Sequence, residues 1–197
     1  MTDSQLIREI KDGNVQLYAE LMRRYERKIL AFIYHMLKSS HMESLADDLC
    51  QDTFYKAYRS LQTFREVEAS FSTWLYTIAR NTVLSELRKN RNVNVSLDQS
   101  AITPQASPET MPEQSILRNE KVGMVREAIN NLPDKQRAAL ILREYDQLDY
   151  QEIAEILGQT VSSVKSLLFR ARASVKLQLE PYLMEPIFQE YEGMKQR

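Results

Sequence analysis

The chain has 197 residues, of which 43% are hydrophobic and 27% are charged, with a formal net charge of −1. This apolar share supports a packed core and excludes global disorder. The longest apolar run, Ile29 to Tyr34, is far shorter than the roughly 20 residues of a membrane span. Because residues 1–5 lack a basic segment before an apolar run, we expect no secretory signal, no membrane insertion and a cytoplasmic protein.

The first ninety residues predict helices. Apolar side chains recur every three or four residues from Val15 to Met36, which indicates one long amphipathic helix. Ser40 and Glu43 have the spacing of a capping box, so we expect a second helix to begin there. Ser70 is the expected N-cap of a third helix that runs over about 71–90.

The sequence gives little support for a metal site or a disulfide. Cys50 is the single cysteine, so no internal disulfide can form, and its place in an apolar helical pattern predicts a buried thiol. His35 and His41 are the only histidines, too few for an ordinary structural zinc site without carboxylates. We therefore expect neither a metal nor a cofactor.

A change in composition divides the chain. Residues 92–114 contain three prolines, several Ser, Thr and Gln, and no basic residue, and they keep no helical period. Helical pattern returns at about Ser115, and Pro133 fits the first turn of a further helix. The predicted fold is all-α with two small domains, at 1–91 and 115–180, a linker at 92–114, and a tail at 181–197.

The most specific local pattern lies between residues 149 and 176. Asp149 and Glu152 have capping-box spacing, and Gly158 can end the short helix that they open. Thr160 can then cap a second, longer helix. A short helix, a glycine turn and a longer helix form the helix-turn-helix layout, whose second helix enters the DNA major groove. The alternative is a helical hairpin inside a bundle.

These segments resemble a known family in two independent blocks. Residues 132–144, 150–157, 161–166 and 169–172 are similar to region 4 of sigma factors. Upstream, Ala46-Asp-Asp-Leu-Cys-Gln-Asp-Thr-Phe54 is similar to region 2.2, and residues 71–81 are similar to regions 2.3 and 2.4. The resemblance covers about residues 4–180, and it points to the compact extracytoplasmic-function group.

The resemblance implies three binding surfaces. One contacts the polymerase β′ clamp helices, one opens and holds the −10 element, and one reads the −35 element. Stacking of unpaired bases on aromatic rings gives the second role a physical basis, and the polar loop 62–70 matches the place where a flipped base is held. In that order, the implied residues are Asp47, Asp48, Gln51 and Asp52; Phe71, Trp74, Tyr76, Arg80, Asn81, Arg88 and Lys89; and Ser162, Ser163, Lys165, Ser166, Phe169, Arg170, Arg172 and Lys176.

Some positions depart from the family pattern. Ser85 and Glu86 stand where aspartate and arginine are common, and this weakens the basic face expected to meet the −10 element. Leu167 replaces a common arginine and is expected to pack on a neighbour. Phe169 could pack inward or meet a thymine methyl. Fully extended, the linker 92–114 reaches at most about 75 Å, enough for two promoter elements separated by roughly 60 Å.

The resemblance implies a sigma factor that binds core RNA polymerase through its β′ clamp helices and β flap, and that recognises promoter DNA. It also implies an anti-sigma factor as a partner. The second hypothesis is a helix-turn-helix regulator that binds DNA without polymerase. An enzyme is not expected, because the chain lacks a glycine-rich phosphate loop, a nucleophile elbow and a histidine-centred triad. Residues 181–197 either pack on the C-terminal domain or contact a regulator.

Overall fold

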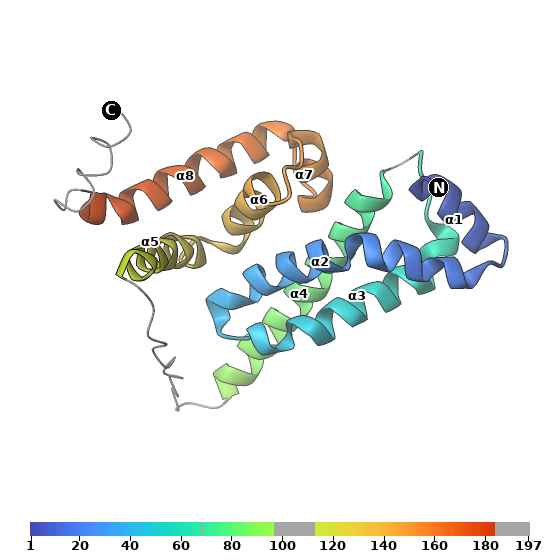
Figure 1. The fold of residues 1–197 in the computed structure, drawn as a ribbon, viewed down its shortest axis with the longest axis horizontal. Helices are drawn as coiled ribbons and strands as arrows, with labels where there is room; N and C mark the ends of the chain where they lie inside the picture. The colour runs from blue at the N-terminus through green and yellow to red at the C-terminus, as the bar shows by residue number, and fades with distance from the viewer. Residues whose placement is uncertain (68, 97–112, 184–197) are drawn as a thin grey trace.

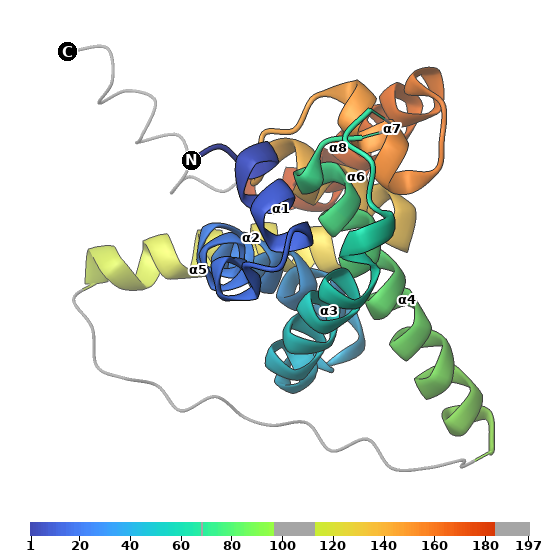
Figure 2. The same ribbon diagram turned by 90° about the vertical axis from the view of Figure 1, so that its right-hand side faces the viewer.

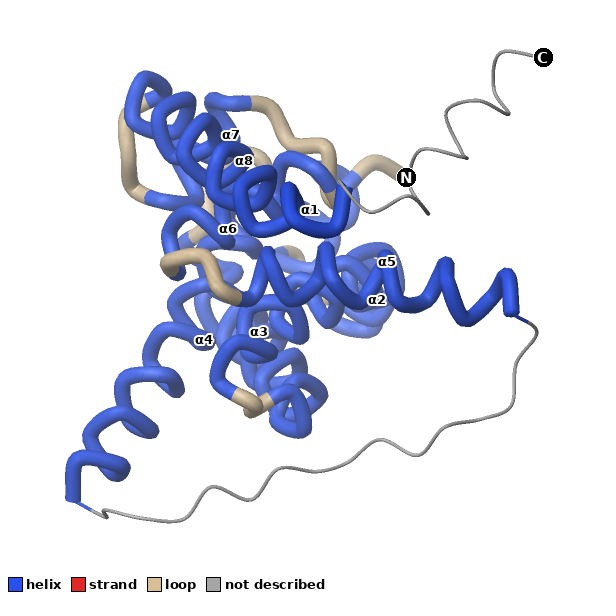
Figure 3. The backbone as a smooth tube through the Cα atoms, turned by 90° about the vertical axis from the view of Figure 1, so that its left-hand side faces the viewer, coloured by secondary structure: helices blue, strands red, loops and turns tan. Residues whose placement is uncertain are grey.

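The computed structural model describes residues 1–67, 69–96 and 113–183, and these residues form helices joined by short loops (Figures 1 and 3). The N-terminal group contains α1 (Asp3–Lys11), α2 (Tyr18–Leu37), α3 (Ala46–Ser60) and α4 (Phe71–Ser96). The C-terminal group contains α5 (Glu113–Asn130), α6 (Asp134–Glu144), α7 (Tyr150–Leu157) and α8 (Val161–Leu183). The described residues contain no strand, which confirms the all-α prediction.

The expected start of the second helix is wrong. Lys38–Ser40 form a 3₁₀ turn that finishes α2, and His41 takes a left-handed conformation with φ 53°. A second 3₁₀ turn, Glu43–Leu45, then leads into α3 at Ala46. Ser40 is used to end one helix and so cannot cap the next, because the left-handed residue after it redirects the chain.

Ser70 is a helix cap, as predicted. The backbone N–H of Thr73 donates to the Ser70 hydroxyl at 3.1 Å, which satisfies one of the free donors of the first turn of α4. The helix continues to Ser96, and α5 begins at Glu113, so helices enter the expected linker from both sides. Residues 97–112 lie outside the described residues.

Helices α2, α3 and α4 build most of the N-terminal core, and α1 adds Leu6, Ile7 and Ile10. Each places a stripe of apolar side chains toward the others, as an amphipathic helix must to bury one face. A hydrogen bond also joins α2 to α3, because the Tyr18 hydroxyl donates to the Phe54 carbonyl at 2.7 Å. The fully or nearly fully buried members include Leu21, Ile29, Phe32, Ile33 and Met36 of α2, Phe54 and Ala57 of α3, and Leu75, Tyr76, Ala79 and Val83 of α4.

The two groups of helices pack against each other. Helix α7 contacts α4, and α6 contacts α2, an arrangement that Figures 1 and 2 show from two directions. The buried apolar cluster continues from Leu75 and Tyr76 on one side to Leu142 and Ile153 on the other. The described part of the chain therefore has one continuous core.

Candidate nucleic-acid interfaces

The helix-turn-helix forms as its sequence predicts. The Asp149 carboxylate accepts from the Glu152 N–H at 2.8 Å, and the Glu152 carboxylate accepts from the Asp149 N–H at 2.9 Å. Gly158 ends α7 in a left-handed conformation with φ 61°, which glycine adopts without steric cost. The Thr160 hydroxyl then accepts from the Ser163 N–H at 3.2 Å and caps α8.

The outer face of α8 is polar and basic with one large apolar side chain. Val164, Leu168 and Ala171 point into the core, so the residues between them face outward. Phe169 is 74% exposed, which excludes inward packing in this structure. The predicted −35 residues that the structure exposes on this face are Ser162, Lys165, Ser166, Phe169 and Arg170, while Ser163 is half-buried.

Arg172 is held by an acidic partner within the domain. Its guanidinium donates to the Glu144 carboxylate at 2.7 and 3.2 Å, and this hydrogen bond raises the pKa of Arg172. Lys176, one turn further along α8, is exposed. Leu167 is partly buried against the core, as predicted from its departure from the family pattern.

A cationic aromatic hollow adjoins this face. Tyr150 begins α7, with the Arg143 guanidinium 4.9 Å and the Lys165 ammonium 5.8 Å from its ring centre. Phe169 and Lys176 line the same hollow. Sequence reasoning did not select Tyr150 or Arg143, because a tyrosine at a helix start has no distinctive pattern.

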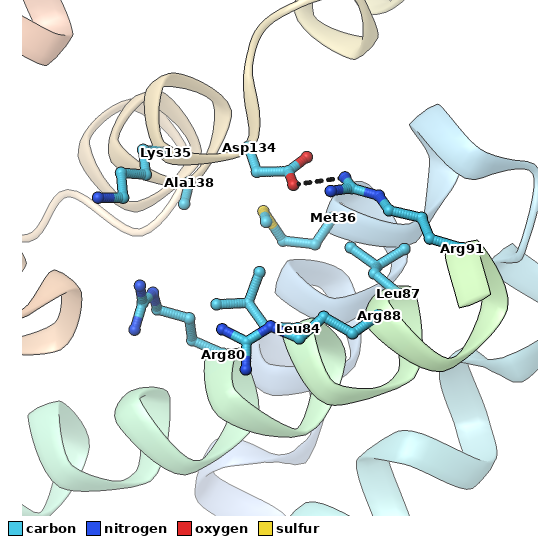
Figure 4. Close-up of a pocket in the computed structure, with 9 residues that line it drawn as sticks. All are labelled: Met36, Arg80, Leu84, Leu87, Arg88, Arg91, Asp134, Lys135 and Ala138. Atoms are coloured by element: carbon cyan, nitrogen blue, oxygen red, sulfur yellow. Dashed lines mark hydrogen bonds and ion pairs between the residues drawn. The ribbon is translucent and has the colours of Figure 1, made fainter.

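The basic residues of α4 face a crevice between the two groups of helices (Figure 4). Arg80, Arg88 and Arg91 line it from α4, and Asp134 and Lys135 line it from α6. Burial, with the neighbouring charge of Arg88, lowers the pKa of Arg80. Arg91 pairs with Asp134 at 3.0 Å and so links the two groups.

The remaining residues predicted to contact the −10 element differ in exposure: some lie on the surface, and the aromatic ones are partly or fully buried. Asn81, Arg88 and Lys89 are exposed. Lys89 pairs with Glu86 at 3.0 Å, so Glu86 offsets part of the positive charge there. Trp74 is partly buried beside Phe64, with ring centres 4.8 Å apart.

Phe71 and Tyr76 lie in the core, with 3% and 1% of their surface exposed. Their predicted contact with DNA stays a prediction, and in this arrangement they support α4 from within. Burial, with the nearby Asp146 carboxylate, raises the pKa of Tyr76. The Tyr76 hydroxyl completes no hydrogen bond of standard geometry to any described residue.

The predicted acidic surface lies on α3. Asp47, Asp48 and Gln51 are exposed, and Asp52 pairs with Lys56 at 2.7 Å. Beside them an apolar hollow of about 530 Å³ lies between α2 and α3, where Tyr55 is 58% exposed. This surface combines negative charge with apolar area, two features suited to binding another protein.

The loop between α6 and α7 joins the two groups of helices, a contact that sequence reasoning missed. The Tyr145 ring lies 4.9 Å from the His35 ring of α2. Asp146 is near Tyr76 of α4 and Lys28 of α2, and burial raises the pKa of its carboxyl. These partners lie 70 or more positions away along the chain, so the loop residues leave no local signal.

The described side chains provide no site for metal binding. They contain no group of three or more His, Cys, Asp or Glu placed to hold a metal ion. Cys50 is buried as predicted, and burial raises the pKa of its thiol to about 11. Among the described helices, none is long and apolar enough to span a membrane.

Comparison with known proteins gives matches in both halves of the chain. The profile of Sigma-70 region 2 matches residues 21–93, and that of Sigma-70 region 4 matches residues 123–175. The chain is 34% identical to the RNA polymerase sigma-H factor of Pseudomonas aeruginosa over 190 residues, which cover 93% of this chain and 96% of that one. It is 33% identical to the ECF RNA polymerase sigma-E factor of Escherichia coli, with 93% and 97% covered.

Solved structures give the same fold. The structure of CnrH in complex with the cytosolic domain of CnrY is similar with a TM-score of 0.65 and 22% identity, covering 91% of this chain and 97% of that one. The sigma factor RpoE of Bartonella quintana, crystallised with the anti-sigma factor NepR, is similar with a TM-score of 0.61 and 27% identity. That match covers 83% of this chain and 96% of RpoE.

Proposed function

The chain belongs to the sigma-70 family, in the extracytoplasmic-function group, and we propose that its binding tasks are divided among three surfaces. The outer face of α8 reads the −35 element, the basic side of α4 holds the −10 element, and the acidic side of α3 docks on core RNA polymerase. A sigma factor directs polymerase to promoters by binding both, so no bond chemistry is assigned to this chain. The domain limits that go with these tasks are 1–91 and 115–180.

The main support for this proposal is the exposed face of α8, whose side chains suit contact with the −35 element. Its first turns present small and flexible polar side chains, Ser162, Lys165 and Ser166, which suit the major groove. The aromatic ring of Phe169 is exposed to water. Contact with a thymine methyl would bury apolar surface of this ring and so favour binding. Arg170 and Lys176 suit phosphate contacts that set register.

Arg172 is proposed as a conditional phosphate contact. It must leave the Glu144 carboxylate, or share it, before it can meet DNA. The pair is about half exposed, so its dissociation costs little, since exposed ion pairs contribute about 0–1 kcal/mol. In free protein, we assign Arg172 to holding α8 against α6.

The −10 surface is proposed to become accessible when the domains separate. Arg80 and Arg88 line a crevice closed on one side by α6, so a DNA strand meets α6 before it reaches Arg80. We therefore infer that polymerase binding opens the contact between α4 and α7.

Two protein partners are proposed for the remaining surfaces. Asp47, Asp48, Gln51 and Asp52 would meet the β′ clamp helices, and the apolar side of the C-terminal domain would meet the β flap. An anti-sigma factor is proposed because similar sigma factors were crystallised with one. A factor that works with polymerase on chromosomal promoters works in the cytoplasm, which is the proposed location.

In vitro transcription with purified core polymerase tests the function. We expect start sites that depend on this chain, and each start site should lie downstream of shared −35 and −10 sequences. Phe169→Ala should reduce initiation while leaving polymerase binding intact. Leu177→Ala is the matched control, because Leu177 is 69% exposed on the same helix but outside the proposed −35 residues. Specific duplex binding by the chain alone, with no new start site, would instead support a polymerase-independent regulator.

A further inference from the structure

The crevice between α4 and α6 has a volume of about 220 Å³ and a strongly cationic lining (Figure 4). Arg80, Arg88 and Arg91 line it from α4, and Lys135 lines it from α6. Asp134 is the single acid among the lining residues, and the others are apolar. Apolar walls reduce the screening of charge by water, so these cations repel one another more strongly than they would on an open surface.

The single acid is already paired with other cations. The Asp134 carboxylate binds the Arg91 guanidinium at 3.0 Å and the guanidinium of buried Arg137 at 2.6 Å. One carboxylate therefore serves two guanidinium groups. It cannot also neutralise the cations on the rest of the lining.

Three cations of the crevice have no acidic partner among the described residues. Arg80, Arg88 and Lys135 take part in none of the ion pairs that these residues form. Arg80 donates to the amide oxygen of its neighbour Asn81, at 3.4 Å. Burial, with the neighbouring charge of Arg88, lowers the pKa of Arg80. An anion placed between these groups would relieve their repulsion.

The three cations approach the crevice from both groups of helices. The Arg88 side chain runs back along α4 toward Arg80 (Figure 4), because side chains of a helix tilt toward its N-terminus. Lys135 lines the opposite wall from α6. One anion in the crevice can therefore contact α4 and α6 together.

The residue types and the volume indicate the class of anion. A guanidinium binds two oxygens of a phosphoryl group at once, and an ammonium binds phosphate as a point charge. The crevice is smaller than the roughly 300–1,000 Å³ of pockets for drug-sized ligands, so it suits a compact anion. A diphosphate group is compact, and its two phosphoryl groups can meet cations on opposite walls.

We propose that the crevice binds a diphosphate group, with Arg80 and Arg88 on one phosphoryl group and Lys135 on the other. The bound anion joins α4 to α6 and stabilises the contact between the two groups of helices. This binding goes beyond the sigma function and rests on the crevice alone. Competition between the anion and the −10 element for Arg80 and Arg88 rests in addition on the proposed function.

Isothermal titration calorimetry of the full chain with inorganic pyrophosphate, in buffer free of divalent metal, tests the site. We expect saturable binding of one ion per chain. Arg88→Ala should weaken the affinity by about tenfold or more, because charge-assisted hydrogen bonds to phosphate are lost. Lys135→Ala should also weaken it, through the loss of a cation on the opposite wall.

Arg23→Ala is the matched control, because it removes an exposed arginine far from the crevice. Arg23 lies on α2, 13 positions before Met36 of the crevice lining, or about 20 Å along the helix axis. Its removal should leave the affinity unchanged. Absence of saturable binding would overturn the proposal. An equal loss of affinity in Arg23→Ala and Arg88→Ala would do the same, because it would show attraction to the general charge of the protein.

Free pyrophosphate and the diphosphate of a nucleotide share this chemistry, and a titration with adenosine diphosphate distinguishes them. Tighter binding of adenosine diphosphate than of pyrophosphate would support the site and assign it to a nucleotide. Equal or weaker binding, with pyrophosphate still saturable, would support the site and assign it to the free anion.

Hydrogen exchange tests whether the anion joins the two groups of helices. Saturating pyrophosphate should slow amide exchange in both α4 and α6 of the unmodified chain, and it should slow neither in Arg88→Ala. Slower exchange in α4 alone would overturn the contact with α6. In vitro transcription without added pyrophosphate tests the sigma function separately, so each proposal can fail while the other stands.

Discussion

Lys165 illustrates how much a single exposed charge can contribute to DNA binding. It stands on the outer face of α8, and its ammonium lies 5.8 Å from the Tyr150 ring centre. Each lysine that neutralises a phosphate releases condensed counterions, so its contribution falls as salt rises. The face holds Phe169 as well, whose contact is apolar and therefore insensitive to salt.

We expect the Lys165 ammonium, on the face that enters the major groove, to neutralise a phosphate as well as approach base edges, so Lys165→Ala should weaken binding of the polymerase complex to promoter DNA. The slope of log affinity against log salt should fall by about 1, the value for one lost phosphate contact. Filter binding or anisotropy across a salt series measures this slope. Leu177→Ala, the exposed control on the same helix, should leave the slope unchanged. An unchanged slope for Lys165→Ala would remove this residue from the phosphate contacts.

Arg137 shows what one buried charge does for the fold. It is 1% exposed, and its guanidinium donates to the Asn130 and Leu132 carbonyls, both at 2.8 Å, and to Asp134 at 2.6 Å. It thereby satisfies carbonyls at the end of α5 that the helix leaves free. Burial lowers its pKa, with Asp134 acting in the opposite direction.

Arg137→Met should lower the free energy of unfolding by about 3 kcal/mol, because it leaves the buried carbonyls of Asn130 and Leu132 without their donor and removes one of the two cations paired with Asp134. Urea denaturation followed by circular dichroism measures the loss. Lys135→Ala, two positions away and exposed, should change stability by no more than about 0.5 kcal/mol. A loss below about 1 kcal/mol for Arg137→Met would mean that water replaces the guanidinium.

At the scale of elements, the turn between α7 and α8 sets the direction of the recognition helix. Gly158 has φ 61°, and a Cβ placed there would meet no atom within 4 Å. The cost of a side chain is therefore a backbone cost alone. Gly158→Ala should destabilise the protein by about 1–2 kcal/mol, and Gly158→Asn by less, since asparagine tolerates this conformation. Denaturant unfolding of the two variants compares them, and equal losses would contradict this cause.

The elements that the sequence could predict are those whose signals are local. Asp149 with Glu152, Gly158 and Ser70 each act within a few residues, and each has its predicted role. The prediction that Ser40 caps the second helix failed because the left-handed conformation of His41 beside it could not be inferred from residue type. Tyr76 was assigned to DNA by resemblance, yet its burial depends on Phe32 of α2, a contact between distant segments. For the same reason, the exposed face of α8 was largely predictable and the crevice around Arg80 was not.

At the scale of the whole molecule, the domain contact should respond to pH through His35. Burial, followed by the charges of Lys38 and Arg126, lowers the pKa of His35, and its ring lies 4.9 Å from that of Tyr145. We call the form in which the two groups of helices are in contact the closed form, and the form in which they have separated the open form. The lowered pKa of His35 means that the closed form binds fewer protons than the open form. The closed form is therefore favoured above about pH 6.5 and loses stability as the pH falls below it.

Small-angle scattering from pH 8 to pH 5.5 should show the radius of gyration rising at the acid end. His35→Phe should remove this rise, because it keeps the ring contact and eliminates the proton. The raised pKa of Asp146 acts in the opposite direction, but it acts in both proteins, so the difference between them isolates the effect of His35. A radius that rises equally in both proteins would exclude His35 as the cause.

The continuous core has a thermodynamic consequence. Because buried apolar residues run from Leu75 in α4 to Ile153 in α7 without a break, neither half can melt without exposing part of the other. Calorimetry of the free chain should therefore record a single endotherm whose calorimetric and van't Hoff enthalpies agree. A partner that pulls the halves apart would divide this endotherm into two, each with about half the enthalpy and a broader width. The shape of the melting curve thus becomes a direct assay for opening.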